Sequence, residues 1–157
     1  MRNSDVSRAE DMIILCSTAV GAETAQKGVR ALCRHFGGRL VYVPVKKDDG
    51  RSAEKIRGVL ADAVGDKPAQ EMLDRLMACF GGLQIYIPFE HKAFKKIIGL
   101  EIYERNRQNG ESMDSLAGDY RISFSHAYRL WHIGQREKFD SSLPYLPFLE
   151  LSYNNSD

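Results

Sequence analysis

The chain contains two similar segments, and this duplication constrains its fold more than any other feature of the sequence. Residues 9–44 align with residues 53–88 at a constant offset of 44 and without a gap, and thirteen of the 36 aligned positions are identical. The identical positions include Gly21/Gly65, Gly37/Gly81, Gly38/Gly82, Tyr42/Tyr86 and Pro44/Pro88. Because chance seldom puts glycines, a tyrosine and a proline in phase, we interpret the two segments as a duplicated structural unit.

Each repeat is predicted to form two helices followed by a short strand. In the second repeat we expect Ser52 to cap a helix whose apolar residues follow helical spacing, and Gly65 to end it. Pro68 suits the first turn of the next helix, and Gly81-Gly82 ends that helix. The first repeat is expected to follow the same plan.

The strands are the β-prone runs 39–44 and 83–88, each of which ends in a proline. A lone strand leaves backbone groups unpaired, and a two-stranded ribbon is marginal unless helices pack on it. Pairing the two runs under four helices meets both needs. We therefore predict a mainly α fold with a small β-ribbon, in which tandem helix-helix-strand repeats make residues 1–88 a pseudo-twofold, dimerisation-like domain. The alternative is an intertwined homodimer in which the strands pair between chains. The residues expected to support pairing are Gly37, Gly38, Tyr42, Gly81, Gly82 and Tyr86.

Residues 89–138 have no counterpart in the first half and are predicted to form a second domain. An amphipathic helix begins near Phe94 and ends within residues 106–110. A short helix capped near Ser112 follows, then a tight turn at Arg121-Ile122 and a second helix capped by Ser123. This is the spacing of a C-terminal helix-turn-helix. Glycine is common at the turn position that Arg121 occupies, because that position often takes a positive φ.

The charge distribution favours a DNA-binding role for this second domain. The whole chain has a net charge of only +1, but residues 91–138 carry nine Lys and Arg against six Asp and Glu, and residues 139–157 carry three acidic residues and no basic one. On the outward face of the second helix, Arg129 can bind guanine or phosphate and Tyr128 can reach a phosphate or a thymine methyl. The predicted DNA-binding residues are Ser123, Ser125, His126, Tyr128, Arg129 and His132, and the predicted phosphate contacts are Lys92, Lys95, Lys96 and Arg136.

Two motifs follow one another in the second half of the chain. The first is the run Phe80-Gly-Gly-Leu-Gln-Ile-Tyr-Ile-Pro88. The second, after a helix that contains Glu101-Ile-Tyr103, comprises Ser115-Leu-Ala117, Tyr120, Ile122-Ser123 and Ala127-Tyr-Arg-Leu130. Together they make residues 53–133 similar to the Mor family of phage middle-operon transcription activators. In that family a helical dimerisation region ends in a Gly-Gly-x-x-x-Tyr-Ile-Pro strand, and a C-terminal helix-turn-helix binds DNA.

The resemblance implies a DNA-binding transcription regulator of a phage or mobile element, acting as an activator. Ser123, Tyr128 and Arg129 match the family's recognition-helix pattern. The chain departs from the family because Arg121 replaces a glycine, Ala127 replaces the usual valine, and the dimerisation unit is duplicated without a second helix-turn-helix. Family members dimerise to place two recognition helices, whereas an internal pseudo-dimer offers one, so we expect a homodimer or a related partner subunit to complete palindromic recognition.

Other function classes are not favoured. No apolar run approaches the ~20 residues that span a bilayer, so we expect a cytoplasmic protein. The cysteines form no metal-binding pattern and no Walker or dinucleotide loop occurs, so neither a metal, a cofactor nor an enzyme is predicted.

The tail, residues 139–157, is rich in aromatic residues and proline, and is a candidate docking peptide for a second subunit or for RNA polymerase; the alternative is that it packs on its own core. A second function class stays open, in which the chain is a protein-interaction module, either partner subunit or antagonist of a related regulator, without specific DNA binding of its own.

Overall fold

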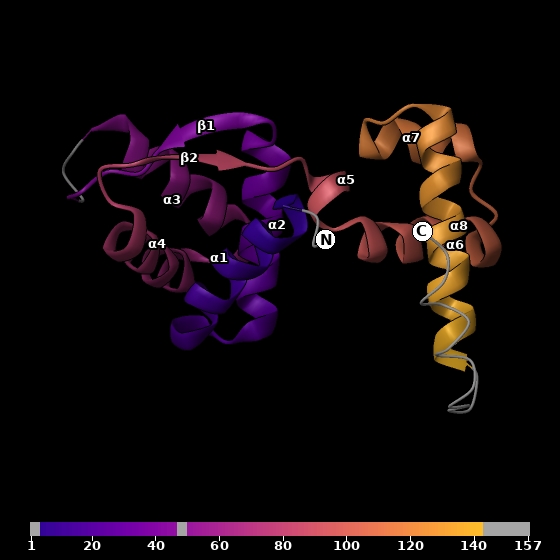
Figure 1. Cartoon of the computed structure of the whole chain (residues 1–157), viewed down its shortest axis with the longest axis horizontal. Coiled ribbons are helices and arrows are strands. Elements are labelled where there is room, and N and C mark those ends of the chain that lie inside the picture. The colour runs from indigo at the N-terminus through magenta and orange to yellow at the C-terminus, as the bar shows by residue number, and fades with distance from the viewer. Residues whose placement is uncertain (1–3, 47–49, 143–157) are drawn as a thin grey trace. The chain divides into compact units, whose positions relative to one another are not determined.

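The computed structural model describes residues 4–46 and 50–142. The chain divides into two compact units, Met1–Phe94 and Lys95–Asp157 (Figure 1). The prediction of a mainly helical fold with a small two-stranded sheet is confirmed. No helix within the described part of the chain is long and apolar enough to cross a membrane.

The first unit contains two helix-helix-strand segments and a short final helix. Its elements are α1 (Ser4–Val20), α2 (Ala22–Phe36), β1 (Arg39–Tyr42), α3 (Arg51–Val64), α4 (Asp66–Phe80), β2 (Gln84–Ile87) and α5 (Glu90–Ala93). The two strands pair antiparallel, with Arg39 opposite Ile87 and Tyr42 opposite Gln84. Figure 1 shows this ribbon lying along one side of the four long helices. The strands of one chain therefore pair with each other.

Backbone geometry repeats between the two segments at the offset of 44 residues. The Gly38 N–H donates to the Ile87 carbonyl and the Gly82 N–H donates to the Val43 carbonyl, each at 2.8 Å. Both glycines have a positive φ, 79° and 83°, which other residues reach only with strain. These two bonds extend the ladder by one step at each end of the ribbon.

The core of the first unit also repeats at this offset. Equivalent positions are buried in pairs, and they are Ala9/Ala53, Met12/Ile56, Cys16/Leu60, Ala25/Ala69, Val29/Leu73, Leu32/Leu76 and Val43/Ile87. The outer face of the ribbon carries exposed apolar side chains, among them Leu40 and Tyr42. The helices thus bury one face of the ribbon and leave the other open.

Three local predictions need correction or fall outside the structure. Ser52 does not cap α3, because that helix begins at Arg51 with Gly50 at the N-cap and no side-chain cap bond. The second strand begins at Gln84 because the Leu83 N–H still donates to the Phe80 carbonyl in the turn that leaves α4. Of the predicted tail 139–157, residues 139–142 continue the last helix and the rest lies outside the described residues.

The second unit is built from three helices. They are α6 (Lys95–Asn109), α7 (Met113–Tyr120) and α8 (Phe124–Ser142).

The predicted helix ends of the second repeat are confirmed. Gly65 ends α3, Pro68 lies in the first turn of α4, and α4 ends before Gly81.

Candidate nucleic-acid interface

Helices α6 and α8 pack closely against each other in the second unit. A Cβ atom added at Gly99 would lie 2.6 Å from the Leu130 carbonyl oxygen, and one added at Gly134 would collide with the Gly99 carbonyl. The two helix backbones therefore touch at these glycines, where no other residue fits. Ile98 and Ile102 of α6 are fully buried beside this crossing.

The turn between α7 and α8 has a defined hydrogen-bond pattern. The Arg121 N–H donates to the Gly118 carbonyl at 3.2 Å and the Ile122 N–H donates to the Ala117 carbonyl at 3.0 Å. Arg121 lies in the left-handed region with φ 54° and ψ 46°, and it is the one non-glycine residue with positive φ within residues 4–46 and 50–142. This is a Schellman motif, in which glycine is the usual residue at the left-handed position. The chain makes the tight turn although Arg121 replaces that glycine.

Serine side chains fix the starts of both helices. The Ser112 hydroxyl accepts a bond from the Ser115 N–H at 3.2 Å at the start of α7, and the Ser123 hydroxyl accepts one from the His126 N–H at 3.2 Å at the start of α8. Both predicted caps are confirmed. Because the Ser123 cap and the Arg121 turn are two residues apart, they determine together the direction in which α8 leaves α7.

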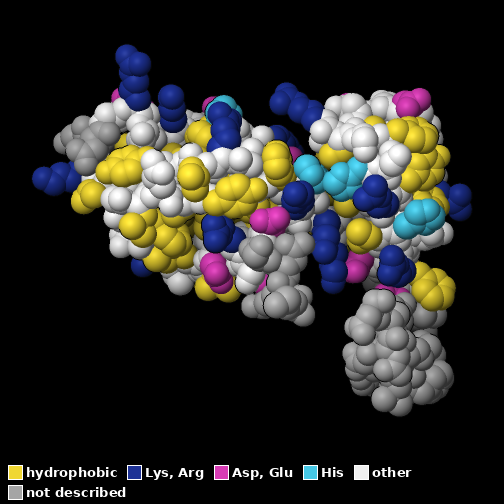
Figure 2. All heavy atoms as spheres, turned by 45° about the horizontal axis from the view of Figure 1, so that its top comes forward, with side chains coloured by type: hydrophobic (Ala, Val, Ile, Leu, Met, Phe, Trp, Pro, Cys, Tyr) yellow, Lys and Arg dark blue, Asp and Glu magenta, His cyan; other side chains and the backbone are white. Residues whose placement is uncertain are grey.

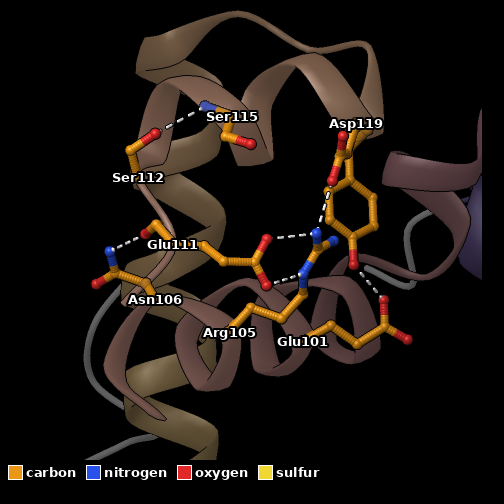
Figure 3. A network of polar contacts seen from close by, with 8 residues as sticks. Glu101, Arg105, Asn106, Glu111, Ser112, Ser115 and Asp119 are labelled. Carbon is orange, nitrogen blue, oxygen red and sulfur yellow. Dashed lines mark hydrogen bonds and ion pairs between the residues drawn. The ribbon is translucent and has the colours of Figure 1, made fainter. Parts of the chain in front are cut away.

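A charged cluster connects α6 to α7 (Figure 3). Arg105 donates to both carboxylate oxygens of Glu111, at 2.9 Å and 2.6 Å, and also to Asp119 at 2.6 Å. Hydrogen bonds from Arg105 lower the pKa of the Glu111 carboxyl, and the two carboxylates raise the pKa of the guanidinium above its usual range. Tyr120 donates to Glu101 at 2.7 Å, and its hydroxyl pKa is raised by burial and by this bond. The cluster holds α7 to α6 through charge-assisted bonds, which are the stronger kind.

Polar contacts also hold α8 to α6. The Trp131 indole N–H donates to Asn106 at 3.1 Å, and Lys138 donates to Glu104 at 3.0 Å. Ala127 and Leu130 of α8 are buried, whereas Trp131 is half-buried. These contacts occupy the inner side of α8 and leave its other side to solvent.

The outer side of α8 carries most of the predicted DNA-binding residues. Ser125, Tyr128, Arg129 and His132 are exposed, and His126 is half-buried. Phe124 and Tyr128 form an exposed aromatic pair with ring centroids 4.9 Å apart. Figure 2 shows Lys, Arg and His side chains among hydrophobic ones on the visible face of this unit. We call this outer side of residues 124–136 the α8 face.

The predicted phosphate contacts come from three helices, α8, α6 and α5. Arg136 lies four residues after His132 and seven after Arg129, so helical spacing places it on the α8 face, and it is exposed. Lys95 and Lys96 belong to α6, and Lys96 forms an ion pair with Glu137 at 3.6 Å. Lys92 belongs to α5 of the first unit, where its ammonium lies 5.6 Å from the Phe89 ring centroid.

Sequence reasoning missed Gln135, an exposed residue of α8 that helical spacing puts on the same side as Tyr128 and His132. It also missed the Arg105 cluster. Glu111 follows Arg105 by only six residues, and this pair of opposite charges around a helix end is the one local sign of the cluster.

Two helices joined by a tight turn, with the second helix presenting cationic and aromatic side chains, are the arrangement used by small DNA-binding modules. The sequence model of the Mor transcription activator family matches residues 51–144. The match covers more than half of the chain, and the chain belongs to the Mor transcription activator family. The comparisons with curated proteins and with solved structures give no match.

Proposed function

We propose that the chain is a DNA-binding transcription regulator and that α7 and α8 form a helix-turn-helix whose second helix enters the major groove. The observation that supports this most directly is the Schellman turn at Arg121 followed at once by the Ser123 cap, which presents the α8 face to solvent. Membership in a family of transcription activators supports an activating role, with RNA polymerase as its protein partner.

The proposed contacts differ along the α8 face. Arg129 donates to guanine or phosphate, Tyr128 and Phe124 contact thymine methyl groups or the backbone, and Ser123, Ser125, His126 and His132 reach base edges or phosphates. Arg136 is the proposed phosphate contact at the far end of the face, with Lys92, Lys95 and Lys96 as further candidates. We also propose that residues 1–88 correspond to the family's dimerisation region, with the first repeat in the place of a second subunit.

Binding of a labelled duplex with a randomised core tests the DNA-binding function. We expect salt-sensitive binding that Arg129→Ala weakens strongly and that Arg107→Ala leaves intact, because Arg107 is exposed on α6 and does not belong to the α8 face. Arg129→Lys then separates the two roles of this residue. Lysine replaces a phosphate contact but not a bidentate contact to guanine. Absence of binding by the wild-type protein at low salt would contradict the proposal.

The second candidate function is a protein-interaction module. The observation that favours it is the exposed apolar side chains along the ribbon and its flanks, which are Leu40, Tyr42, Val45, Leu83 and Phe89. A module of this kind would bind no DNA at low or at moderate salt concentration. The duplex-binding titration described above therefore distinguishes the two functions.

A further inference from the structure

One carboxylate of the first unit is held by two arginines from the other repeat. Glu90, at the start of α5 just after the second strand, accepts bonds from Arg30 Nε at 2.7 Å and from Arg34 Nε and Nη2 at 3.1 Å and 2.9 Å. The Glu90 side chain is only 13% exposed and that of Arg30 only 19%. We call this group the Glu90 clamp. It fastens the end of the second repeat to α2 of the first.

The equivalent positions at the offset of 44 reverse the charges of Glu90 and Arg30 and carry no charge in place of Arg34. Lys46 stands where Glu90 stands, Asp74 stands where Arg30 stands, and Ala78 stands where Arg34 stands. Pairing of two first repeats would therefore bring Lys46 to the arginines of the other copy. Pairing of two second repeats would bring Glu90 to Asp74 of the other copy. Only unlike repeats place opposite charges together, since like charges in a half-buried contact repel.

Side-chain size also favours pairing of unlike repeats over pairing of like repeats. Gly28 and Met72 are equivalent positions, and they face each other across the pseudo-twofold arrangement: a Cβ added at Gly28 would lie 2.6 Å from Met72 Sδ. Both residues are buried. Two first repeats would bring glycine against glycine and leave a cavity, and two second repeats would bring methionine against methionine and overfill the contact.

We infer that the first repeat is a dedicated in-chain partner for the dimerisation surface of the second repeat, and that the Glu90 clamp with its charge-reversed counterpart and the Gly28–Met72 contact together disfavour pairing between like repeats of two chains, the clamp contributing the larger part. The partner that this surface fits is thus residues 4–46 of the same chain. The inference rests on the pseudo-dimer arrangement proposed above but not on DNA binding. It is therefore tested by measurements made without DNA, and its failure would leave the DNA-binding proposal unchanged.

Charge reversal with rescue tests the clamp. We expect the wild-type chain to sediment without DNA at 17.8 kDa, the mass of one chain. Glu90→Lys makes the clamp repulsive within the chain and attractive toward Asp74 of a second copy, so its mass is expected to rise toward two chains. Adding Arg30→Asp and Arg34→Ala gives the clamp the residues of its counterpart. The single-chain mass is then expected to return, because the tethered first repeat again offers an opposite charge and its effective concentration exceeds that of a second chain. The control exchanges Glu23 and Lys27, an exposed ion pair within α2.

Disulfide formation in a Cys79→Ser background identifies which strands pair. Val41 lies opposite Ile85, and these two residues are themselves equivalent, so pairing of second repeats would put Ile85 opposite Ile85 of the other chain. We expect Val41→Cys with Ile85→Cys to close a disulfide within one chain. Ile85→Cys alone is expected to link two chains only when combined with Glu90→Lys. The inference would be overturned if the double cysteine variant gave two-chain products, or if Ile85→Cys linked chains equally with and without Glu90→Lys. Failure of the variant that combines Glu90→Lys, Arg30→Asp and Arg34→Ala to restore the wild-type mass would also overturn it.

Discussion

Arg121 adopts a backbone conformation that glycine reaches at the least cost. An L residue other than glycine pays roughly 1–2 kcal/mol in the left-handed region, although glycine also gains more freedom when the chain unfolds. We therefore expect Arg121→Gly to stabilise the second unit by about 1 kcal/mol. Trp131 is the chain's one tryptophan and lies in this unit, so its fluorescence during urea unfolding measures the change.

The control for this prediction is the same substitution in a right-handed helical position. Arg107 is exposed in α6 and helical, so Arg107→Gly is expected to destabilise the unit by about 1 kcal/mol. Equal effects of the two substitutions would show that the conformation at Arg121 has no energetic consequence.

Glu90 makes the stability of the first unit depend on pH. Burial alone would raise the pKa of this carboxyl, but hydrogen bonds from Arg34 and Arg30 outweigh burial and lower it from its ordinary value of 4.5. The folded state therefore favours the ionised form, and the stabilisation is present above pH 4.5 and is lost as the pH falls through the lowered pKa. We expect the free energy of unfolding to decline on this acid side in the wild type and to decline less in Glu90→Gln, as measured by urea unfolding followed by circular dichroism.

At the scale of elements, the α6–α8 crossing is the contact least tolerant of change. A methyl group at Gly134 would collide with the Gly99 carbonyl, so Gly134→Ala is expected to destabilise the second unit by about 3 kcal/mol or more. Gly118 provides the matched control, because it is exposed in α7 and a Cβ there meets nothing within 4 Å. Gly118→Ala is expected to stabilise the unit by about 0.5–1 kcal/mol. Trp131 fluorescence during urea unfolding measures both effects. Similar losses in the free energy of unfolding for Gly134→Ala and Gly118→Ala would show that the helix crossing is not the cause.

Element positions could be predicted where their causes are local. The hydroxyls of Ser112 and Ser123 each accept a bond from the N–H three residues later, and Gly65 and Gly81 directly follow the helices that they end. These causes are local, so the sequence alone was enough to locate the helix ends. Ser52 was predicted wrongly because the helix begins one residue earlier, at Arg51, with Gly50 at its N-cap. The duplication made the strand pairing predictable, since each run had a counterpart with which to pair.

Contacts between distant residues could not be predicted in this way. Gly99 and Gly134 are far apart in sequence, and nothing local distinguishes them from a helix-weakening glycine such as Gly118. Arg105 gathers Glu111 and Asp119 only after α6 and α7 have packed. The DNA-binding residues stay a prediction, because helical spacing gives the exposed side of α8 but not the ligand that it meets.

At the scale of the whole molecule, the number of phosphate contacts is predicted to be small, because each chain has one α8 face. The slope of the logarithm of DNA affinity against the logarithm of salt concentration is about −0.9 for each phosphate neutralised. We expect Arg136→Ala to reduce the steepness of this slope by about 0.9, with a similar loss of affinity on every sequence. Lys138→Ala is the control, because Lys138 belongs to the same helix but donates to Glu104. An unchanged slope for Arg136→Ala would remove this residue from the interface.

The pairing of β1 with β2 inside one chain affects how the protein responds to its own abundance. A ribbon assembled from two separate chains comes apart on dilution, so the concentration of the assembled form falls with the square of expression level when expression is low. Here the partner strand is tethered, and its effective concentration stays constant however few chains the cell contains. The amount of assembled ribbon then follows gene dosage in direct proportion, which gives a graded response where a regulator assembled from separate chains has a threshold.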